Sequence, residues 1–149
     1  MINIYTDGAC RGNPGPGGYG VIVKQNGDIK TFAQGYRKTT NNRMELLGVI
    51  IALEALPQER QSVTVYSDSK YVVDAIQKGW LKNWLKIDFK SKKNPDLWKR
   101  FWMAYQKHLV DFCWIRGHAG HYENEHCDRL AVESSYGNLL IDSYYENNR

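Results

Sequence analysis

The sequence contains little cysteine and no long hydrophobic run, and these absences exclude several classes of protein. Three cysteines, Cys10, Cys113 and Cys127, form no CxxC pair and cannot all be joined, which excludes a disulfide framework and indicates a reducing, cytoplasmic setting. The longest apolar run, Leu46–Leu53, has eight residues, whereas a membrane-spanning helix needs about 20. The first residues, Met1–Asp7, lack the basic and apolar regions of a signal peptide. We therefore expect no association with a membrane.

The composition is that of a globular protein, with 149 residues of which 42% are hydrophobic and 24% charged. This length predicts a single domain over residues 1–149 that is large enough to bury a core. The net charge of +4 is unevenly distributed along the chain. Residues 82–100 contain seven basic and two acidic residues, a net +5, so the other 130 residues sum to −1.

Four of the five tryptophans lie in or beside this basic segment, namely Trp80, Trp84, Trp98 and Trp102. Basic residues interleaved with aromatic ones favour a surface for a polyanion, because they suit a phosphate backbone and exposed sugars or bases. The alternative is a solvated helix face whose aromatic rings pack inward. The residues alone leave both interpretations open.

Hydrophobic periodicity and turn signals predict the order βββαβααβα. The strands are expected over 2–7, 19–23, 30–36, 62–67 and 110–115, and the helices over about 42–56, 71–78, 94–105 and 124–136. Asn26-Gly27 is a strong hairpin turn between the second and third strands. This order predicts an α/β fold with a five-stranded mixed sheet, three antiparallel N-terminal strands plus parallel additions, flanked by helices. The tail over about 137–149 receives no assignment.

The segment Gly15–Gly20 matches the dinucleotide-binding pattern GxGxxG letter for letter. That motif works by opening a helix whose N-terminus holds a pyrophosphate. Here it opens a strand that ends at the Asn26-Gly27 hairpin, so we reject a dinucleotide site.

Four acidic residues fall at similar places in the predicted fold. Asp7 ends the first strand, Asp68 ends the fourth, and Glu45 and Asp128 lie in the first turns of the first and last helices. If the first and fourth strands are neighbours joined by a right-handed crossover, Asp7 and Asp68 emerge side by side at the edge where ligands of such sheets bind. The two helix N-termini would then point nearby.

Each acid also has a purely structural interpretation, since Glu45 and Asp68 could cap helices and Asp7 could occupy a turn. Four converging carboxylates, however, would repel one another unless a cation neutralised them. Hard oxygen ligands favour Mg²⁺ or Mn²⁺, and two such ions about 4 Å apart form an arrangement that cleaves phosphodiesters.

The histidines offer a competing zinc site, because His118, His121, His126 and Cys127 lie within ten residues. Their spacing fits none of the usual zinc pairs, and His126 and Cys127 diverge on a helix. We reject zinc. A histidine in a glycine-flanked loop near carboxylates favours proton transfer, which points to His118.

Four segments together resemble the bacterial type 1 ribonuclease H family. They are Thr6–Gly15 (TDGACRGNPG), Thr39–Leu46 (TTNNRMEL), Tyr66–Ser69 (YSDS) and Gly117–Asp128 (GHAGHYENEHCD), and the resemblance runs from Ile2 to about Ser135. It implies the RNase H fold and hydrolysis of the RNA strand of RNA–DNA hybrids with two Mg²⁺ ions, for which Mn²⁺ substitutes, leaving 5′-phosphate and 3′-hydroxyl ends. We further expect a monomer without an obligate protein partner.

The same resemblance assigns roles to individual residues. Asp7, Glu45, Asp68 and Asp128 would be catalytic metal ligands, and His118 would assist proton transfer or product departure. Ribose 2′-hydroxyls and the minor groove would be read by Cys10 (through its backbone), Asn13, Asn41 and Asn42. A phosphate of the DNA strand would be held by Thr40, Asn94 and Lys38. A basic protrusion over about 80–96 would grip the hybrid through Trp80, Trp84, Lys90, Lys92 and Lys93.

The residue chemistry agrees with these roles, because 2′-hydroxyls both donate and accept hydrogen bonds and Asn side chains can do the same. Two features depart from the family: Lys70 stands where Gln is frequent, and the protrusion is shorter than in well-known bacterial members. The alternative function is a non-catalytic module that binds the hybrid through its basic segment. A DNA-directed nuclease on the same fold is disfavoured by Asn13, Asn41 and Asn42.

Overall fold

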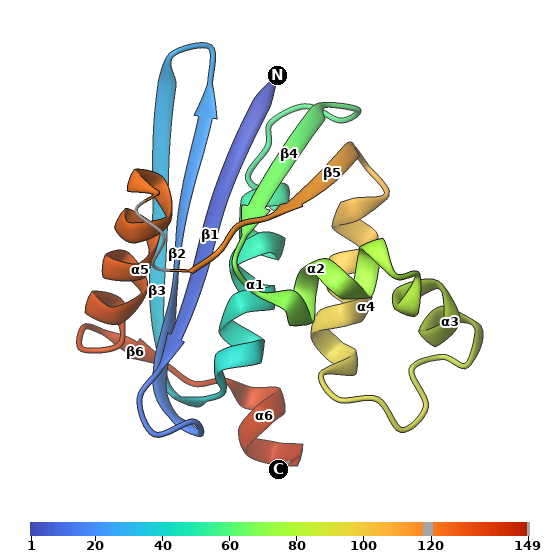
Figure 1. The fold of residues 1–149 in the computed structure, drawn as a ribbon. Coiled ribbons are helices and arrows are strands. Elements are labelled where there is room, and N and C mark those ends of the chain that lie inside the picture. The colour runs from blue at the N-terminus through green and yellow to red at the C-terminus, as the bar shows by residue number, and fades with distance from the viewer. Residues whose placement is uncertain (118–120, 149) are drawn as a thin grey trace.

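We describe residues 1–117 and 121–148 of a computed structural model (Figure 1). In these residues six strands form one sheet in the order β5-β4-β1-β2-β3-β6. The strands are β1 (Ile2–Cys10), β2 (Gly15–Gln25), β3 (Asp28–Thr39), β4 (Ser62–Ser67), β5 (Leu109–Trp114) and β6 (Leu139–Leu140). β1, β2 and β3 pair antiparallel, whereas β1–β4, β4–β5 and β3–β6 are parallel. The predicted mixed sheet is confirmed.

The number of strands expected from the sequence, five, was wrong by one. The sixth strand, β6, has two residues, which is too short for an alternating pattern to show. The helices are α1 (Asn41–Glu54), α2 (Lys70–Gln77), α3 (Trp80–Lys86), α4 (Pro95–Tyr105), α5 (Tyr122–Ser134) and α6 (Ser143–Asn148). Neither α3 nor α6 was predicted, because each spans at most two turns. None of the described helices is long and apolar enough to cross a bilayer.

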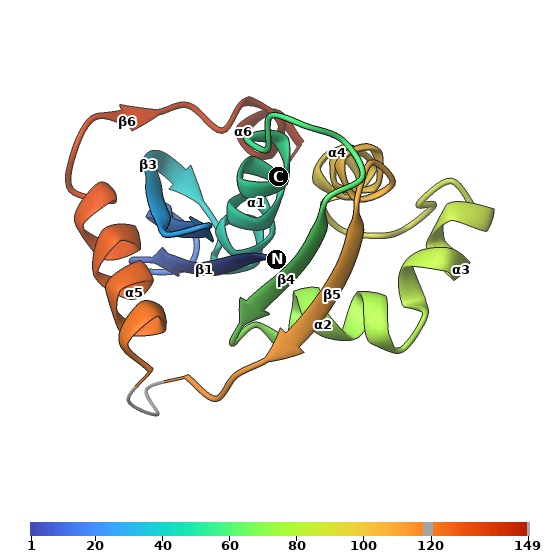
Figure 2. The ribbon, with the colours of Figure 1, turned by 90° about the horizontal axis from the view of Figure 1, so that it is seen from above.

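The helices form two layers on the sheet. Figure 2 shows α1, α2 and α4 on one face and α5 on the other. α1 is enclosed between the sheet and α4, so it buries more than a single stripe of side chains: Met44, Leu46, Leu47, Val49, Ile50, Ala52 and Leu53 are all buried. The aromatic residues of α4 belong to the core, because Trp98 and Phe101 have no exposed surface.

The glycine-rich segment belongs to β2, which confirms that it is not a dinucleotide loop. Its glycines let α5 lie directly on the strand: a Cβ added to Gly20 would be 2.3 Å from the carbonyl oxygen of Cys127. The hairpin between β2 and β3 is also confirmed, since Asn26 and Gly27 have φ of 52° and 84°, as a type I′ turn requires.

Candidate active site

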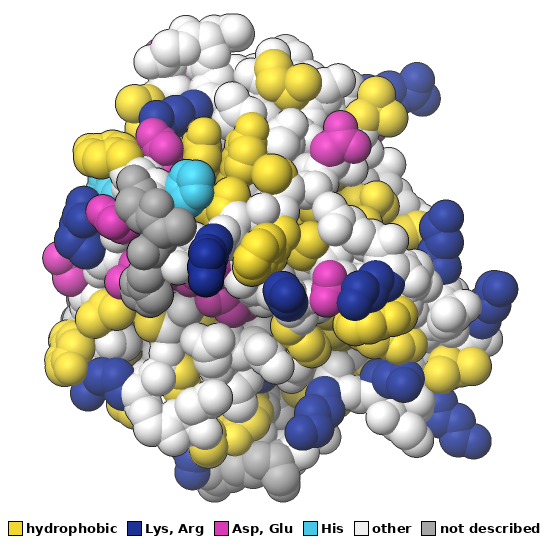
Figure 3. Space-filling view, viewed as in Figure 1, with side chains coloured by type: hydrophobic (Ala, Val, Ile, Leu, Met, Phe, Trp, Pro, Cys, Tyr) yellow, Lys and Arg dark blue, Asp and Glu magenta, His cyan; other side chains and the backbone are white. Residues whose placement is uncertain are grey.

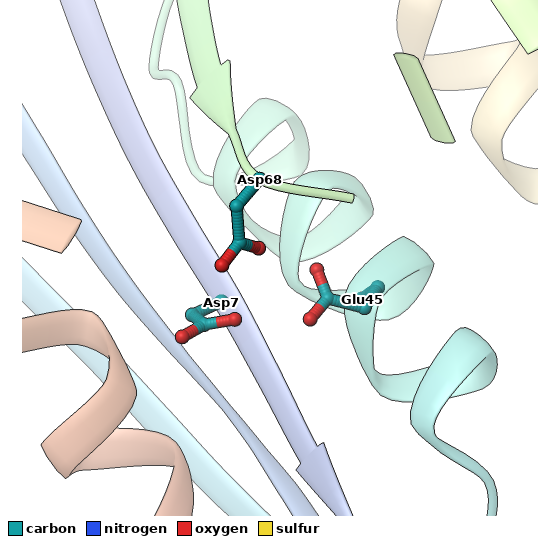
Figure 4. A group of neighbouring side chains, drawn as sticks. All are labelled: Asp7, Glu45 and Asp68. Carbon is teal, nitrogen blue, oxygen red and sulfur yellow. The ribbon is translucent and has the colours of Figure 1, made fainter. Parts of the chain in front are cut away.

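Three of the four predicted carboxylates come together at one point of the sheet. Asp7 lies within β1, Asp68 directly follows β4, and Glu45 projects from α1 toward both (Figure 4). One carboxylate oxygen of each lies within 4.8 Å of the others. Because β1 and β4 are adjacent and parallel, as the sequence argument assumed, the two aspartates are brought side by side.

The fourth carboxylate, Asp128 of α5, lines the same cavity as the other three, which has a volume of about 390 Å³. Both helical acids lie in the second turn and not the first, because α1 begins at Asn41 and α5 at Tyr122. Asn124, where the sequence pattern places the start of this helix, is a buried residue inside α5, and His121 occupies the cap position.

The backbone of Gly8 brings α1 close to β1 and orients the acids. Its N–H donates to Glu45 Oε1 and to Asp7 Oδ1, both at 2.9 Å. A Cβ at this position would be 2.5 Å from the backbone nitrogen of Glu45, so only glycine allows this approach. Sequence reasoning did not identify Gly8, although it directly follows Asp7 in the quoted motif.

The structural alternatives for these acids do not apply. Thr40 caps α1 by accepting a hydrogen bond from the backbone N–H of Arg43 at 3.2 Å. Ser69 caps α2 in the same way, from Val72 at 3.3 Å. Asp7 continues a strand that runs to Cys10 and is not in a turn. None of the three acids is therefore explained as a cap or turn residue.

Burial makes this cluster costly in its charged form. Asp7 and Glu45 are 5% and 4% exposed. Burial, with the charges of Asp68 and Asp128 nearby, raises the pKa of Asp7 to about 7. Burial and the neighbouring Asp7 raise the pKa of Glu45 well above its ordinary value. Such shifts are expected where carboxylates are clustered without a compensating cation.

The cluster fits a divalent cation. Its donors are carboxylate oxygens, the ligands that Mg²⁺ and Mn²⁺ prefer. Glu45 Oε2 is buried and has no hydrogen-bond partner among the residues that the structure describes. A buried charged oxygen without a partner is unfavourable, and a metal ion would supply the missing interaction.

Two predicted substrate residues, Asn41 and Asn42, line the acidic cavity together with Lys70. The Lys70 ammonium lies 4.9 Å from the centre of the Trp114 ring, and the Trp114 indole donates to the backbone oxygen of Asp68 at 3.2 Å. Lys70, which stands where Gln is frequent in the resembled family, therefore places a positive charge at the edge of the carboxylate site.

A second and larger cavity, of about 650 Å³, lies beside the first, and Asn42 lines both. It brings together five more of the predicted substrate residues: Asn13, Thr40, Lys92, Lys93 and Asn94. The side chain of Asn13 also accepts a hydrogen bond from the backbone N–H of Asn41 at 2.9 Å, which joins the β1–β2 loop to the start of α1.

The other predicted substrate residues line neither cavity. They are Cys10, Lys38, Trp80, Trp84 and Lys90. Trp84 is half-buried with its ring 5.3 Å from that of Trp98, so it packs inward, whereas Trp80 is 40% exposed. Figure 3 shows Lys and Arg side chains spread over α3 and its surroundings. Within the basic segment, inward packing of the aromatic rings therefore applies to Trp84, whereas an exposed surface suited to a polyanion applies to Trp80 and the lysines.

Two features of this region were not identified from the sequence. Arg43 lines the larger cavity although it is almost completely buried, and α6 contributes Tyr144, Tyr145 and Asn148 to the wall. The predicted proton-transfer residue, His118, lies outside the described residues. The acidic group is the only set of three or more potential metal ligands found in the described part of the chain.

Comparison with known proteins assigns the family. A profile of the RNase H family matches residues 1–136. The chain belongs to the ribonuclease H family. It is 52% identical to the ribonuclease H of Rippkaea orientalis, over 98% of this chain and 93% of that one, and 52% identical to that of Desulforamulus reducens, over 95% and 92%. The family predicted from the sequence, bacterial type 1 ribonuclease H, is confirmed.

Solved structures agree with this assignment. LC9-RNase H1, described as a type 1 RNase H with the type 2 active-site motif, superposes with a TM-score of 0.82 at 35% identity, covering 99% of this chain and 81% of that one. LC11-RNase H1 in complex with an RNA/DNA hybrid has a TM-score of 0.67 at 27% identity, covering 91% and 97%. Enzymes of this family are metal-dependent endoribonucleases that hydrolyse the RNA strand of RNA–DNA hybrids, so the predicted fold and enzyme class are confirmed.

Proposed function

We propose that the chain cuts the RNA strand of RNA–DNA hybrids at its four-carboxylate cavity, with two Mg²⁺ ions or Mn²⁺ in their place. The observation that carries the proposal is the convergence of Asp7, Glu45 and Asp68 within 4.8 Å, with a buried Glu45 oxygen that lacks a partner among the described residues. When bound, the ions activate water and stabilise the leaving oxygen. The alternative, a non-catalytic hybrid-binding module, has no use for this cluster.

Individual residues of the chain have separate roles in this reaction. Asp7, Glu45, Asp68 and Asp128 hold the ions, and Gly8 keeps the Glu45 carboxylate turned toward the site through its hydrogen bond at 2.9 Å. The role of His118 in proton transfer or product departure stays a prediction.

Recognition of RNA rests on the polar residues at the cavity edge. Asn41 and Asn42 line the carboxylate site, so their amides can donate to and accept from ribose 2′-hydroxyls of the strand being cut. Asn13 binds the backbone of Asn41 and thereby supports this edge. The backbone of Cys10, which follows in the same strand as Asp7, is proposed to complete the minor-groove contacts.

Recognition of DNA rests on the larger cavity. Thr40 and Asn94 line it together with Lys92 and Lys93, which supports their proposed contact with a phosphate of the DNA strand. Lys38, Lys90 and Trp80 lie outside both cavities and would contact the hybrid beyond them. Trp84 packs inward against Trp98, so only the exposed part of its half-buried side chain would take part. The three cysteines are free, in keeping with the proposed cytoplasmic setting. A monomer without an obligate protein partner stays a prediction.

Three duplexes of one sequence test the proposal: an RNA–DNA hybrid, duplex DNA and duplex RNA, each with Mg²⁺, with Mn²⁺ and with EDTA. Cutting of the hybrid's RNA strand alone, with 5′-phosphate ends and no cutting in EDTA, supports it. Binding of the hybrid without turnover in either metal would favour the non-catalytic module. Cutting of duplex DNA as fast as the hybrid would favour a DNA-directed nuclease.

A further inference from the structure

The C-terminal helix α6 forms one wall of the 650 Å³ cavity. Tyr144, Tyr145 and Asn148 line it together with the residues proposed to hold a DNA phosphate. Figure 1 shows α6 below the start of α1, beside the loop that joins α3 to α4. These residues belong to the tail that neither the sequence pattern nor the family match, which ends at residue 136, assigns to a function.

The tail is held firmly against the start of α1. Asp142 is buried and accepts hydrogen bonds from Arg43 Nε at 2.7 Å, from a second Arg43 nitrogen at 2.9 Å and from Thr39 Oγ1 at 2.7 Å. At the outer side of α6, Glu146 pairs with Arg37 at 2.8 Å. These two ion pairs, one to α1 and one to β3, fix α6 as a wall of the cavity.

The same arginine joins the tail to the predicted phosphate contact. Arg43 also donates to Asn94 Oδ1 at 3.2 Å, and it pairs with Asp96 at 2.7 Å. The amide nitrogen of Asn94 in turn donates to the Tyr71 hydroxyl at 2.9 Å. The tail, the α3–α4 loop and the start of α1 are therefore one connected polar unit around this cavity.

The size and lining of the cavity indicate what it takes. Its volume lies within the roughly 300–1,000 Å³ of sites that hold whole small molecules, which leaves room for sugar and neighbouring backbone beside one phosphate. Lys92 and Lys93 line it with four Asn side chains, and no carboxylate is among its described lining residues. Such a lining suits an anionic strand, and its continuity with the site of cutting points to the hybrid itself.

We propose that α6 is part of the substrate interface: Tyr145 and Asn148 contact the DNA strand of the hybrid next to the phosphate held by Thr40 and Asn94. The inference rests on the proposed function and extends its substrate site to the C-terminal tail. An Asn amide donates a hydrogen bond to phosphate or sugar oxygens, and a Tyr ring covers the apolar face of a deoxyribose while its hydroxyl stays available to a phosphate.

Neighbouring residues of α6 provide a matched control. Both Asn147 and Asn148 are exposed, but only Asn148 lines the cavity. Asn148→Ala and Tyr145→Ala are expected to weaken hybrid binding, measured in EDTA, by roughly fivefold each and to raise KM with kcat nearly unchanged. Asn147→Ala should leave both unchanged. Tyr145→Phe, which keeps the ring, separates loss of the hydroxyl from loss of packing, and thermal unfolding of each variant shows that it folds.

A chemical probe on the DNA strand locates the contact. Single methylphosphonate linkages, which remove one phosphate charge, are moved along the DNA strand of a hybrid. At one position of the methylphosphonate along the strand, the unaltered protein should lose severalfold more affinity than Asn148→Ala does. At every other position, the effects of the methylphosphonate and of Asn148→Ala on the binding free energy should be additive. The inference would be overturned if the two effects were additive at every position of the methylphosphonate, or if Asn147→Ala and Asn148→Ala lost equal hybrid affinity. Absence of hybrid cutting by the unaltered protein would instead overturn the proposed function.

Discussion

At the residue scale, the site depends on two acids that the fold buries. Asp7 and Glu45 are among the least exposed charged residues, and the backbone of Gly8 holds both carboxylates in place. In the absence of a cation their charges are unfavourable, which is why the pKa values of both are raised. The sequence indicated which acids converge, through their positions after strands and in helices. It did not indicate Gly8 or Arg43, because their roles depend on approaches between segments far apart in the chain.

This burial predicts how stability changes with pH in metal-free protein. The folded-state pKa of Asp7, about 7, lies above its ordinary value of 3.8, so the folded form binds the proton more tightly than the unfolded form. Stability should therefore fall as the pH rises from about 4 through 7. Asp7→Asn removes this loss, and at pH 8 in EDTA it should stabilise the protein by about 2–4 kcal/mol, with little effect at pH 4.

Urea unfolding at the two pH values measures this difference. With saturating Mg²⁺, the unaltered protein should become the more stable of the two at pH 8. A cation that binds only the folded protein stabilises the unaltered chain more than the variant, which lacks one of the carboxylates. An Asp7→Asn variant that is less stable than the unaltered protein at pH 8 in EDTA would contradict the inference that the buried charge of the Asp7 carboxylate destabilises the metal-free protein.

At the element scale, the loop between α3 and α4 is where the basic segment meets the site. The sequence predicted the main strands and α1, α2, α4 and α5 because each has a clear period or turn signal. It missed α3, β6 and α6, which have seven, two and six residues and are positioned by packing more than by pattern. The charge excess was visible in the sequence, but only the structure separates lysines that line the cavity from those that do not.

That separation leads to a test with salt. The double variant Lys92→Ala/Lys93→Ala should weaken hybrid binding and flatten the dependence of log affinity on log salt by about 0.9 for each phosphate that these lysines neutralise. Lys107→Ala serves as the control, because this exposed lysine lies between α4 and β5 and lines neither cavity. Titrations from low to high salt measure the slope. If the double variant keeps the slope of the unaltered protein, the loop is merely a solvated surface.

At the scale of the whole molecule, residues distant in sequence assemble around one arginine. Arg43 in α1 pairs with Asp96 of α4 and with Asp142 of the tail, at 2.7 Å in each case. The ion pair between Arg43 and Asp142 spans 99 residues of sequence, and no local sequence pattern predicts such a contact. The sequence argument could assume that β1 and β4 are neighbours because a right-handed crossover is the usual connection, whereas a tail docked by one buried ion pair follows no such rule.

Breaking this pair should be costly. Asp142→Asn leaves part of the buried Arg43 charge without its partner and should lower the free energy of unfolding by about 3 kcal/mol. Arg37→Gln, which breaks the more exposed ion pair of the tail, should cost much less. Urea unfolding at pH 7 provides the comparison, and equal losses in the two variants would show that the buried pair is not what holds the tail.

The proposed function requires that the four carboxylates form a metal-dependent site for cutting RNA in hybrids. The most direct test measures cleavage of a labelled hybrid with Mg²⁺ by Asp7→Asn, Glu45→Gln, Asp68→Asn and Asp128→Asn, with hybrid affinity in EDTA as the control for folding and binding. We predict that each variant binds the hybrid at least as tightly as the unaltered protein and cuts it on the order of 100-fold more slowly or worse. Undiminished cutting by a variant with all four acids amidated would contradict the assignment of the four carboxylates as the cutting site.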